Sequence, residues 1–410
     1  MRLASLLALL VLLCCVPTAR ECSFLCEKSG ECPGGLACGT DGYCHADNDH
    51  TLCSATDVDG GQSGDGATNC VGCIQGGPYN YVFVTSTTHV PGMLGSVLNA
   101  DQICQARAQA AGLPGTYMAW LSTSTQSASD RIAGKQARGW IRPDHRPFTD
   151  SLEKLTQSDQ VFYPLRIDEQ GSDIAGTNFP ILVATGTAKT GATAAGQTCN
   201  DWTQTGGTYA AGEATATAVF WTASTPTNCT VEAHLYCFGV DSATPLSLSA
   251  EMGRIAFVSQ DAFALSSGRP LADAFCQQQA AKFGLATPES FLALLPLSSE
   301  SAASRLNMSG ATWVRTDGVP WMAAASDLVA GKILTALNVD SQGLYGSAIS
   351  VWAGSADPNA LGTQDCNDWT STSGSVLMGR ADVSDPRAFR DPWNNNATCS
   401  GPGRLYCLQK

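Results

Sequence analysis

The sequence predicts an α+β protein in which one disulfide-bonded domain occurs in two tandem copies. Four cysteines recur in each copy, at a period of about 170 residues that suits a domain rather than a solenoid repeat. The first group is Cys104, Cys199, Cys229 and Cys237, and the second is Cys276, Cys366, Cys399 and Cys407. Because a reducing compartment does not favour a chain with 18 cysteines, we expect disulfides and export.

Each copy is predicted to pack one or two helices on a twisted, mostly antiparallel sheet. In the first copy we expect strands at 79–85, 117–121 and 235–237, and a helix that begins at a cap at 99–101 and ends at Gly112. In the second copy we expect strands at 255–259, 291–295 and 405–408, and a helix at about 270–283. The recurring Trp140 and Trp313 are interpreted as core residues.

The first 19 residues have the features of a signal peptide. Arg2 precedes an apolar run that is too short to span a bilayer, and small residues follow it up to Ala19. Two processing routes fit this segment: cleavage after Ala19, or acylation of Cys15 within a lipobox-like sequence at 12–15. Either route gives a protein that is extracellular or on the outer cell surface, without a membrane span and with a lipid anchor only in the second case.

A small module at 20–57 is predicted to depend on disulfides, because so short a segment cannot bury a core. Its six cysteines allow fifteen pairings, and the sequence selects none of them. They are Cys22, Cys26, Cys32, Cys38, Cys44 and Cys53. Metal binding is the weaker alternative, since their spacing does not form two CxxC pairs.

Residues 58–77 are predicted to form a flexible acidic and glycine-rich linker. A calcium loop is the alternative, but Gly61 and Thr68 stand where an EF-hand loop needs an oxygen ligand and a glutamate. Cys70 and Cys73 form a CxxC, which we interpret as a structural clip rather than a redox centre because no thioredoxin-like pattern surrounds it.

Charge and histidine content restrict the function. The net charge of -13, without any lysine or arginine run, argues against nucleic acid and anionic lipid as partners. All five histidines precede residue 240, which excludes a histidine mechanism shared by both copies. They are His45, His50, His89, His145 and His234. The matched aspartates Asp168 and Asp340 are more typical of turns than of catalysis.

The segment from Ala100 to Ser122 resembles the opening of endostatin, the C-terminal domain of collagens XV and XVIII. The Val-Trp-Ala-Gly-Ser sequence at 351–355 is similar to its tryptophan-glycine-serine loop, and 199–202 stands where endostatin has Cys-Glu-Thr-Trp. The resemblance implies two C-type-lectin-like domains, at 78–240 and 254–410, joined by a linker at 241–253. It also implies the bridges Cys104–Cys237, Cys199–Cys229, Cys276–Cys407 and Cys366–Cys399.

Two properties of endostatin are not expected here. Endostatin binds zinc through histidines near its N-terminus, and neither copy begins with a histidine cluster. It binds heparin through an arginine patch, and this chain is acidic. Bacterial endostatin-like surface proteins act as adhesins, so the resemblance favours adhesion to a matrix protein or polysaccharide.

The repeated Cys-Asn-Asp-Trp sequence is the main candidate for ligand or calcium binding. Its oxygen-bearing side chains belong to Asn200, Asp201, Asn367 and Asp368. We favour a turn beside a disulfide, because this order is not the Trp-Asn-Asp of calcium-dependent lectins. Trp393 and the two asparagines after it lie nearer the lectin position, but they lack the aspartate.

These features favour an exported, non-enzymatic binding protein without a cofactor, in which two copies provide avidity for a repetitive ligand such as polysaccharide or matrix. A structural envelope protein without a soluble ligand is one alternative. A calcium-dependent lectin is the other.

Overall fold

The computed structural model describes residues 37–38, 44–45, 70–74, 77–176, 179–265, 268–394 and 397–410. The predicted signal peptide with Cys15, and most of the predicted cysteine-rich module, lie outside these ranges. Within that module, β1 (Ala37–Cys38) and β2 (Cys44–His45) pair antiparallel. The chain divides into the units Met1–Cys70 and Val71–Lys410, so both copies of the repeat belong to one unit.

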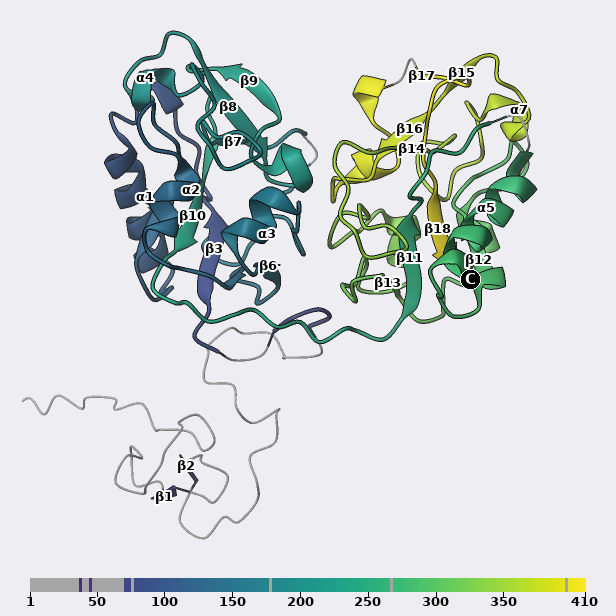
Figure 1. The fold of residues 1–410 in the computed structure, drawn as a ribbon, viewed down its shortest axis with the longest axis horizontal. Helices are drawn as coiled ribbons and strands as arrows, with labels where there is room; N and C mark the ends of the chain where they lie inside the picture. Colours follow the sequence, from purple (N-terminus) through teal and green to yellow (C-terminus); the bar gives the residue numbers. More distant parts are fainter. Residues whose placement is uncertain are drawn as a thin grey trace, which may run out of the picture. The chain divides into compact units, whose positions relative to one another are not determined.

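The first copy is an eight-stranded mixed sheet with helices beside it (Figure 1). Its strands are β3 (Asn80–Val84), β4 (Tyr117–Ala119), β5 (Trp140–Ile141), β6 (Pro147–Thr149), β7 (Leu182–Ala184), β8 (Thr208–Glu213), β9 (Thr225–Asn228) and β10 (His234–Gly239). Its helices are α1 (Val97–Ala110), α2 (Ala128–Ala133), α3 (Leu152–Gln157) and α4 (Cys199–Trp202). The combination of helices and a mostly antiparallel sheet is an α+β fold.

Strand β10 lies at the centre of this sheet. It pairs antiparallel with β3 and β4, and parallel with β7. Since successive strand residues point to opposite faces, Leu235 and Cys237 pack into the core under α1, whereas Tyr236 and Phe238 pack into a second core on the other face. Both faces of β10 are therefore buried, which explains why its residues form an almost continuous apolar run.

The strands of the second copy form one four-stranded sheet and two two-stranded sheets. They are β11 (Arg254–Val258), β12 (Phe291–Ala293), β13 (Trp313–Arg315), β14 (Ser350–Trp352), β15 (Ser375–Val376), β16 (Met378–Arg380), β17 (Ala397–Thr398) and β18 (Tyr406–Gln409). Its helices are α5 (Gly268–Lys282), α6 (Asp327–Ala330) and α7 (Cys366–Trp369). Strand β18 pairs antiparallel with β11 and β12, as β10 does with β3 and β4.

Short 3-10 helices complete the connections within the described residues. They span Pro91–Met93, Ala218–Trp221, Pro288–Ser290, Ala303–Arg305, Pro386–Ala388 and Pro392–Asn394. No helix in the described ranges combines the length and the apolar character that a bilayer crossing requires.

The expected start of the first helix was wrong by three residues. The helix begins at Val97 because the Ser96 hydroxyl caps it, accepting a hydrogen bond of 3.1 Å from the backbone nitrogen of Asn99. Asn99 lies inside the first turn, and its side chain donates to the Leu94 carbonyl. Gly112 ends the helical segment with a positive φ, as expected.

Among the described residues of the two predicted linkers, 70–74 and 77 in the first and 241–253 in the second, some are hydrogen-bonded to the first copy. At the end of the first, Ile74 donates its backbone N–H to the His145 carbonyl at 2.9 Å. In the second, Leu246 is buried and its backbone N–H donates to the Asp150 carboxylate at 2.8 Å. These backbone hydrogen bonds fasten Ile74 and Leu246 to the first copy.

Each copy contains two disulfides, in the pairs that the endostatin resemblance implies. They are Cys104–Cys237, Cys199–Cys229, Cys276–Cys407 and Cys366–Cys399. Cys70 and Cys73 are also disulfide-bonded. The first and third bridges fasten the long helix of each copy to its last strand, and the other two close the loop after the Cys-Asn-Asp-Trp sequence.

We predict that replacing both Cys104 and Cys237 with alanine destabilises the first copy by about 5 kcal/mol, and that replacing Cys199 and Cys229 costs roughly 1 kcal/mol less. The reason is that the first bridge spans 133 residues and the second spans 30, so the first restricts the unfolded chain more. Guanidinium unfolding followed by tryptophan fluorescence measures both values. A larger loss for the shorter loop would contradict this explanation.

Candidate functional site

The repeated Cys-Asn-Asp-Trp sequence forms a left-handed turn in both copies. Every residue of α4 has a φ between 50° and 70°, and every residue of α7 has a φ between 53° and 68°. Left-handed backbone costs a residue other than glycine about 1–2 kcal/mol, so a run of four is unusual. The flanking disulfide and the buried tryptophan hold each turn in place, since Trp202 and Trp369 are fully buried.

The aspartate of each turn holds the loop that follows β4 in the first copy and β12 in the second. The carboxylate of Asp201 accepts hydrogen bonds from the backbone nitrogen and the hydroxyl of Ser124, at 2.6 and 2.7 Å. The carboxylate of Asp368 accepts the same two bonds from Ser298, at 2.7 and 3.1 Å. Partial burial would raise the pKa of Asp201, but the Ser124 bonds outweigh it and lower that pKa.

The asparagines and tryptophans of the turns also bond within the protein. The side-chain amides of Asn200 and Asn367 donate to the hydroxyl of the threonine three residues later, at 3.1 and 3.0 Å. The indole nitrogen of Trp202 donates to the Ser122 carbonyl at 2.9 Å. Gly186 has no room for a Cβ beside the Trp202 ring. The carboxylates of both aspartates and the amide nitrogens of both asparagines thus bond within the protein.

The other duplicated acidic residues are also engaged. Asp168 and Asp340 each accept backbone N–H bonds from the residues two and four positions later, which makes them turn residues. Asp101 accepts a bond from the Ala119 backbone and forms an ion pair with Arg131 at 2.6 Å. Among the described residues, no group of three or more His, Cys, Asp or Glu could hold a metal ion.

The described histidine side chains all belong to the first copy. His145 is exposed in a turn and lies edge-on to the Tyr81 ring. The ring Nδ1 of His234 lies 2.6 Å from the Thr85 carbonyl, and burial lowers the pKa of this histidine. The pKa of His89 is also lowered, first by burial and then by Arg107. The side chain of His45 and all of His50 lie outside the described part of the chain.

Contacts between the two copies form a polar cluster that the repeat pattern did not indicate. Gly212 on β8 pairs with Val183 of β7, and Gly379 on β16 pairs with Val351 of β14. The two glycines are therefore equivalent residues of the repeat. Four residues further along, Ala216 and Val383 pair antiparallel, with backbone hydrogen bonds of 2.8 Å on both sides. Equivalent residues therefore face each other, as across the two-fold axis of a homodimer.

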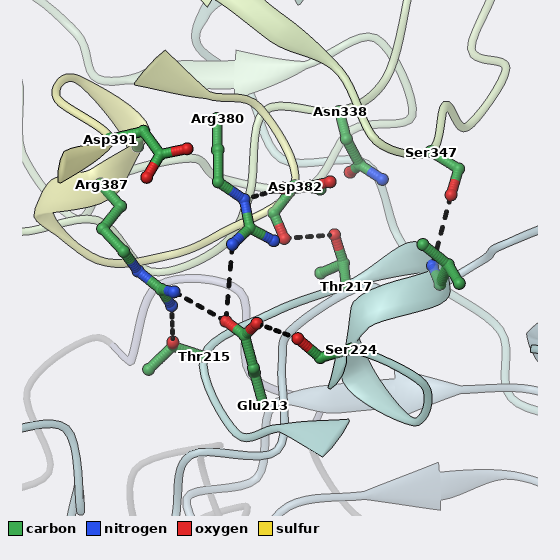
Figure 2. A network of polar contacts seen from close by, with 12 residues as sticks. Glu213, Thr215, Thr217, Ser224, Asn338, Ser347, Arg380, Asp382, Arg387 and Asp391 are labelled. Carbon is green, nitrogen blue, oxygen red and sulfur yellow. Dashed lines mark hydrogen bonds and ion pairs between the residues drawn. The ribbon is translucent and has the colours of Figure 1, made fainter. Parts of the chain in front are cut away.

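Buried ion pairs surround this backbone contact (Figure 2). The Glu213 carboxylate of the first copy lies 2.7 Å from the Arg387 guanidinium and 3.6 Å from that of Arg380. Within the second copy, Arg387 also pairs with Asp385 at 2.7 Å, and Arg380 pairs with Asp382 at 3.0 Å. Glu213 and Arg380 occupy equivalent positions, so identical copies would bring two like charges together here.

Asp382 is the titrating residue of this network. It is buried, and burial raises its pKa to about 6; Arg380 opposes the rise and Glu213 adds to it. The bonded network contains two guanidiniums and three carboxyl groups. Protonation of one carboxyl therefore balances the charge of the network, and burial is the main cause of the raised pKa of Asp382.

One tryptophan departs from the buried pattern of the others. Trp393 is 60% exposed, whereas the remaining eight tryptophans are at most 2% exposed. Its ring lies beside the Arg387 guanidinium, which also lies over the Phe179 ring. The predicted core positions of Trp140 and Trp313 are confirmed. The exposure of Trp393 was not expected, because most tryptophans are largely buried.

No family model matches the chain, and no curated protein matches it. The similarity to endostatin therefore depends on the sequence motifs and on the order of the cysteines.

We predict that Asp201→Ala destabilises the protein by about 1–3 kcal/mol, because it removes two hydrogen bonds to Ser124 and places alanine in a left-handed backbone. Asp201→Asn is the matched control, and it should lose less because asparagine tolerates this backbone and keeps one acceptor. Urea unfolding measures both variants. If instead the wild-type melting temperature rises on adding calcium and falls with EDTA, the aspartate is a calcium ligand and the scaffold role is wrong.

We predict that Asp382→Asn changes the pH dependence of stability. Since the pKa rises from 3.8 to about 6 on folding, the stabilising effect of this group is complete below its unfolded value and is lost as the pH rises through about 6. The difference corresponds to about 3 kcal/mol. The variant should therefore exceed the wild type in stability at about pH 7 but not at about pH 4.

Urea unfolding across this pH range tests the prediction, with Glu289→Gln as a control at an exposed carboxyl group. Parallel stability curves for the wild type and Asp382→Asn would show that Asp382 does not titrate in this range.

Proposed function

We propose that the chain is an exported, adhesin-like, non-enzymatic binding protein with two endostatin-like domains of C-type-lectin-like fold. The observation that carries this proposal is the use of the repeated polar residues. In the first copy Asp101 and Asp201 bond to a neighbouring strand and loop, and Asp168 bonds within its own turn. Their counterparts in the second copy do the same. The shared residues thus maintain a frame, and ligand contacts are left to the surface loops that differ.

The proposed ligand is an extracellular polysaccharide or a matrix protein. The net charge of -13 disfavours nucleic acid and anionic lipid surfaces. The Glu213–Arg387 ion pair and the backbone contact beside it join the two copies. Two linked copies suit a repetitive ligand, because binding by one copy makes the second contact intramolecular.

An array of glycans and matrix proteins, probed with the full-length mature protein, tests this function. We expect binding to one ligand class, and we expect it to be equal in calcium and in EDTA because Asp201 and Asp368 are engaged by serines. Binding that EDTA abolishes would indicate a calcium-dependent lectin instead. Absence of binding across the array would favour a structural envelope protein.

A further inference from the structure

The Trp393 side chain is exposed to solvent, which is typical of a ligand-binding residue rather than of a core residue. Its side chain is 60% exposed although eight other tryptophans of the chain are buried. Exposed tryptophan presents a large apolar ring and one N–H donor to solvent, and such residues are enriched among those that dominate binding energy.

The loop that carries Trp393 differs between the two copies. Cys399 follows Gly379 by 20 residues, whereas Cys229 follows the equivalent Gly212 by 17 residues. The second copy therefore has three additional residues in this stretch, and Trp393 lies within it. Trp393 thus belongs to the variable part of the repeat and not to its shared frame.

The Trp393 ring is also held in position. The Arg387 guanidinium lies 5.3 Å from the centre of the Trp393 ring and 5.4 Å from that of Phe179, which comes from the first copy. Arg387 is itself fixed by Glu213 and Asp385, and it is 2% exposed. The backbone N–H of Trp393 donates to the Asp391 carboxylate at 3.1 Å. Both copies thereby contribute aromatic rings to one pre-organised surface.

We propose that Trp393, supported by Arg387 and Phe179, is a stacking platform for the pyranose rings of a neutral polysaccharide. This proposal rests on the proposed binding function and names the ligand class for it. The C–H face of a pyranose is apolar and flat, so it packs on an indole while its hydroxyl groups remain in water. The positive charge of Arg387 is already engaged by two carboxylates, and the chain is acidic, so an anionic polysaccharide gains no attraction here.

Binding of the full-length mature protein to immobilised neutral polysaccharides tests the proposal. We expect Trp393→Ala to weaken binding at least tenfold without changing the melting temperature, and Trp393→Phe to retain part of the affinity. Leu98→Ala is the matched control, because Leu98 is 67% exposed and lies on α1 of the first copy. Its binding should equal that of the wild type.

Fluorescence gives an independent measurement of the same contact. Because Trp393 is the exposed tryptophan, we expect acrylamide to quench a component of the emission that Trp393→Phe lacks. A bound neutral polysaccharide should protect this component from quenching.

The outcomes separate the platform from the general binding function. Equal polysaccharide binding by Trp393→Ala and the wild type would overturn the platform and leave the binding function intact. Binding to matrix proteins or anionic glycans alone would overturn the neutral-polysaccharide assignment. A wild-type protein that binds nothing on the array would overturn both proposals.

Discussion

The last strand of each copy is the element on which the rest of the domain depends. In the first copy, β10 pairs with β3, β4 and β7, and Cys237 on the same strand is bonded to Cys104 on α1. Both faces of the strand are buried. A change in its register by one residue would exchange the two cores and separate the cysteines, so the disulfide and the apolar alternation specify the same alignment.

The contact between the copies shows how a duplicated domain can acquire a directional interface. Ala216 faces Val383 across an approximate two-fold axis, as equivalent residues do in a symmetric dimer. Three residues before this pair, the equivalent residues Glu213 and Arg380 differ in charge, and Glu213 forms ion pairs with Arg380 and Arg387. Buried ion pairs contribute little net stability against an apolar alternative, but they penalise pairings that leave a charge unmatched. This network therefore favours joining unlike copies over joining like ones.

The sequence was sufficient for features that depend on local pattern or on repetition. Recurrence indicated the scaffold role of Asp201 and Asp368, and the recurring Leu-Tyr-Cys sequence located the last strand of each copy. The helix start was misplaced because Ser96 and Asn99 are both good caps, and only the backbone decides between them. The sequence did not predict the interface, because Glu213 and Arg380 are equivalent positions with different residues. A repeat pattern indicates only residues that both copies share. The exposure of the Trp393 side chain was not predicted, because exposure depends on tertiary packing.

The order of these elements along the chain also constrains how the protein is assembled. The bridges Cys104–Cys237 and Cys276–Cys407 each connect an early helix to a final strand, so neither core closes until that strand has been synthesised. The first copy can close while the second is still incomplete. Glu213 can form its ion pairs with Arg380 and Arg387 only after those residues of the second copy have been synthesised. The ion pairs between the copies therefore depend on the second copy, whereas the two disulfides of the first copy do not.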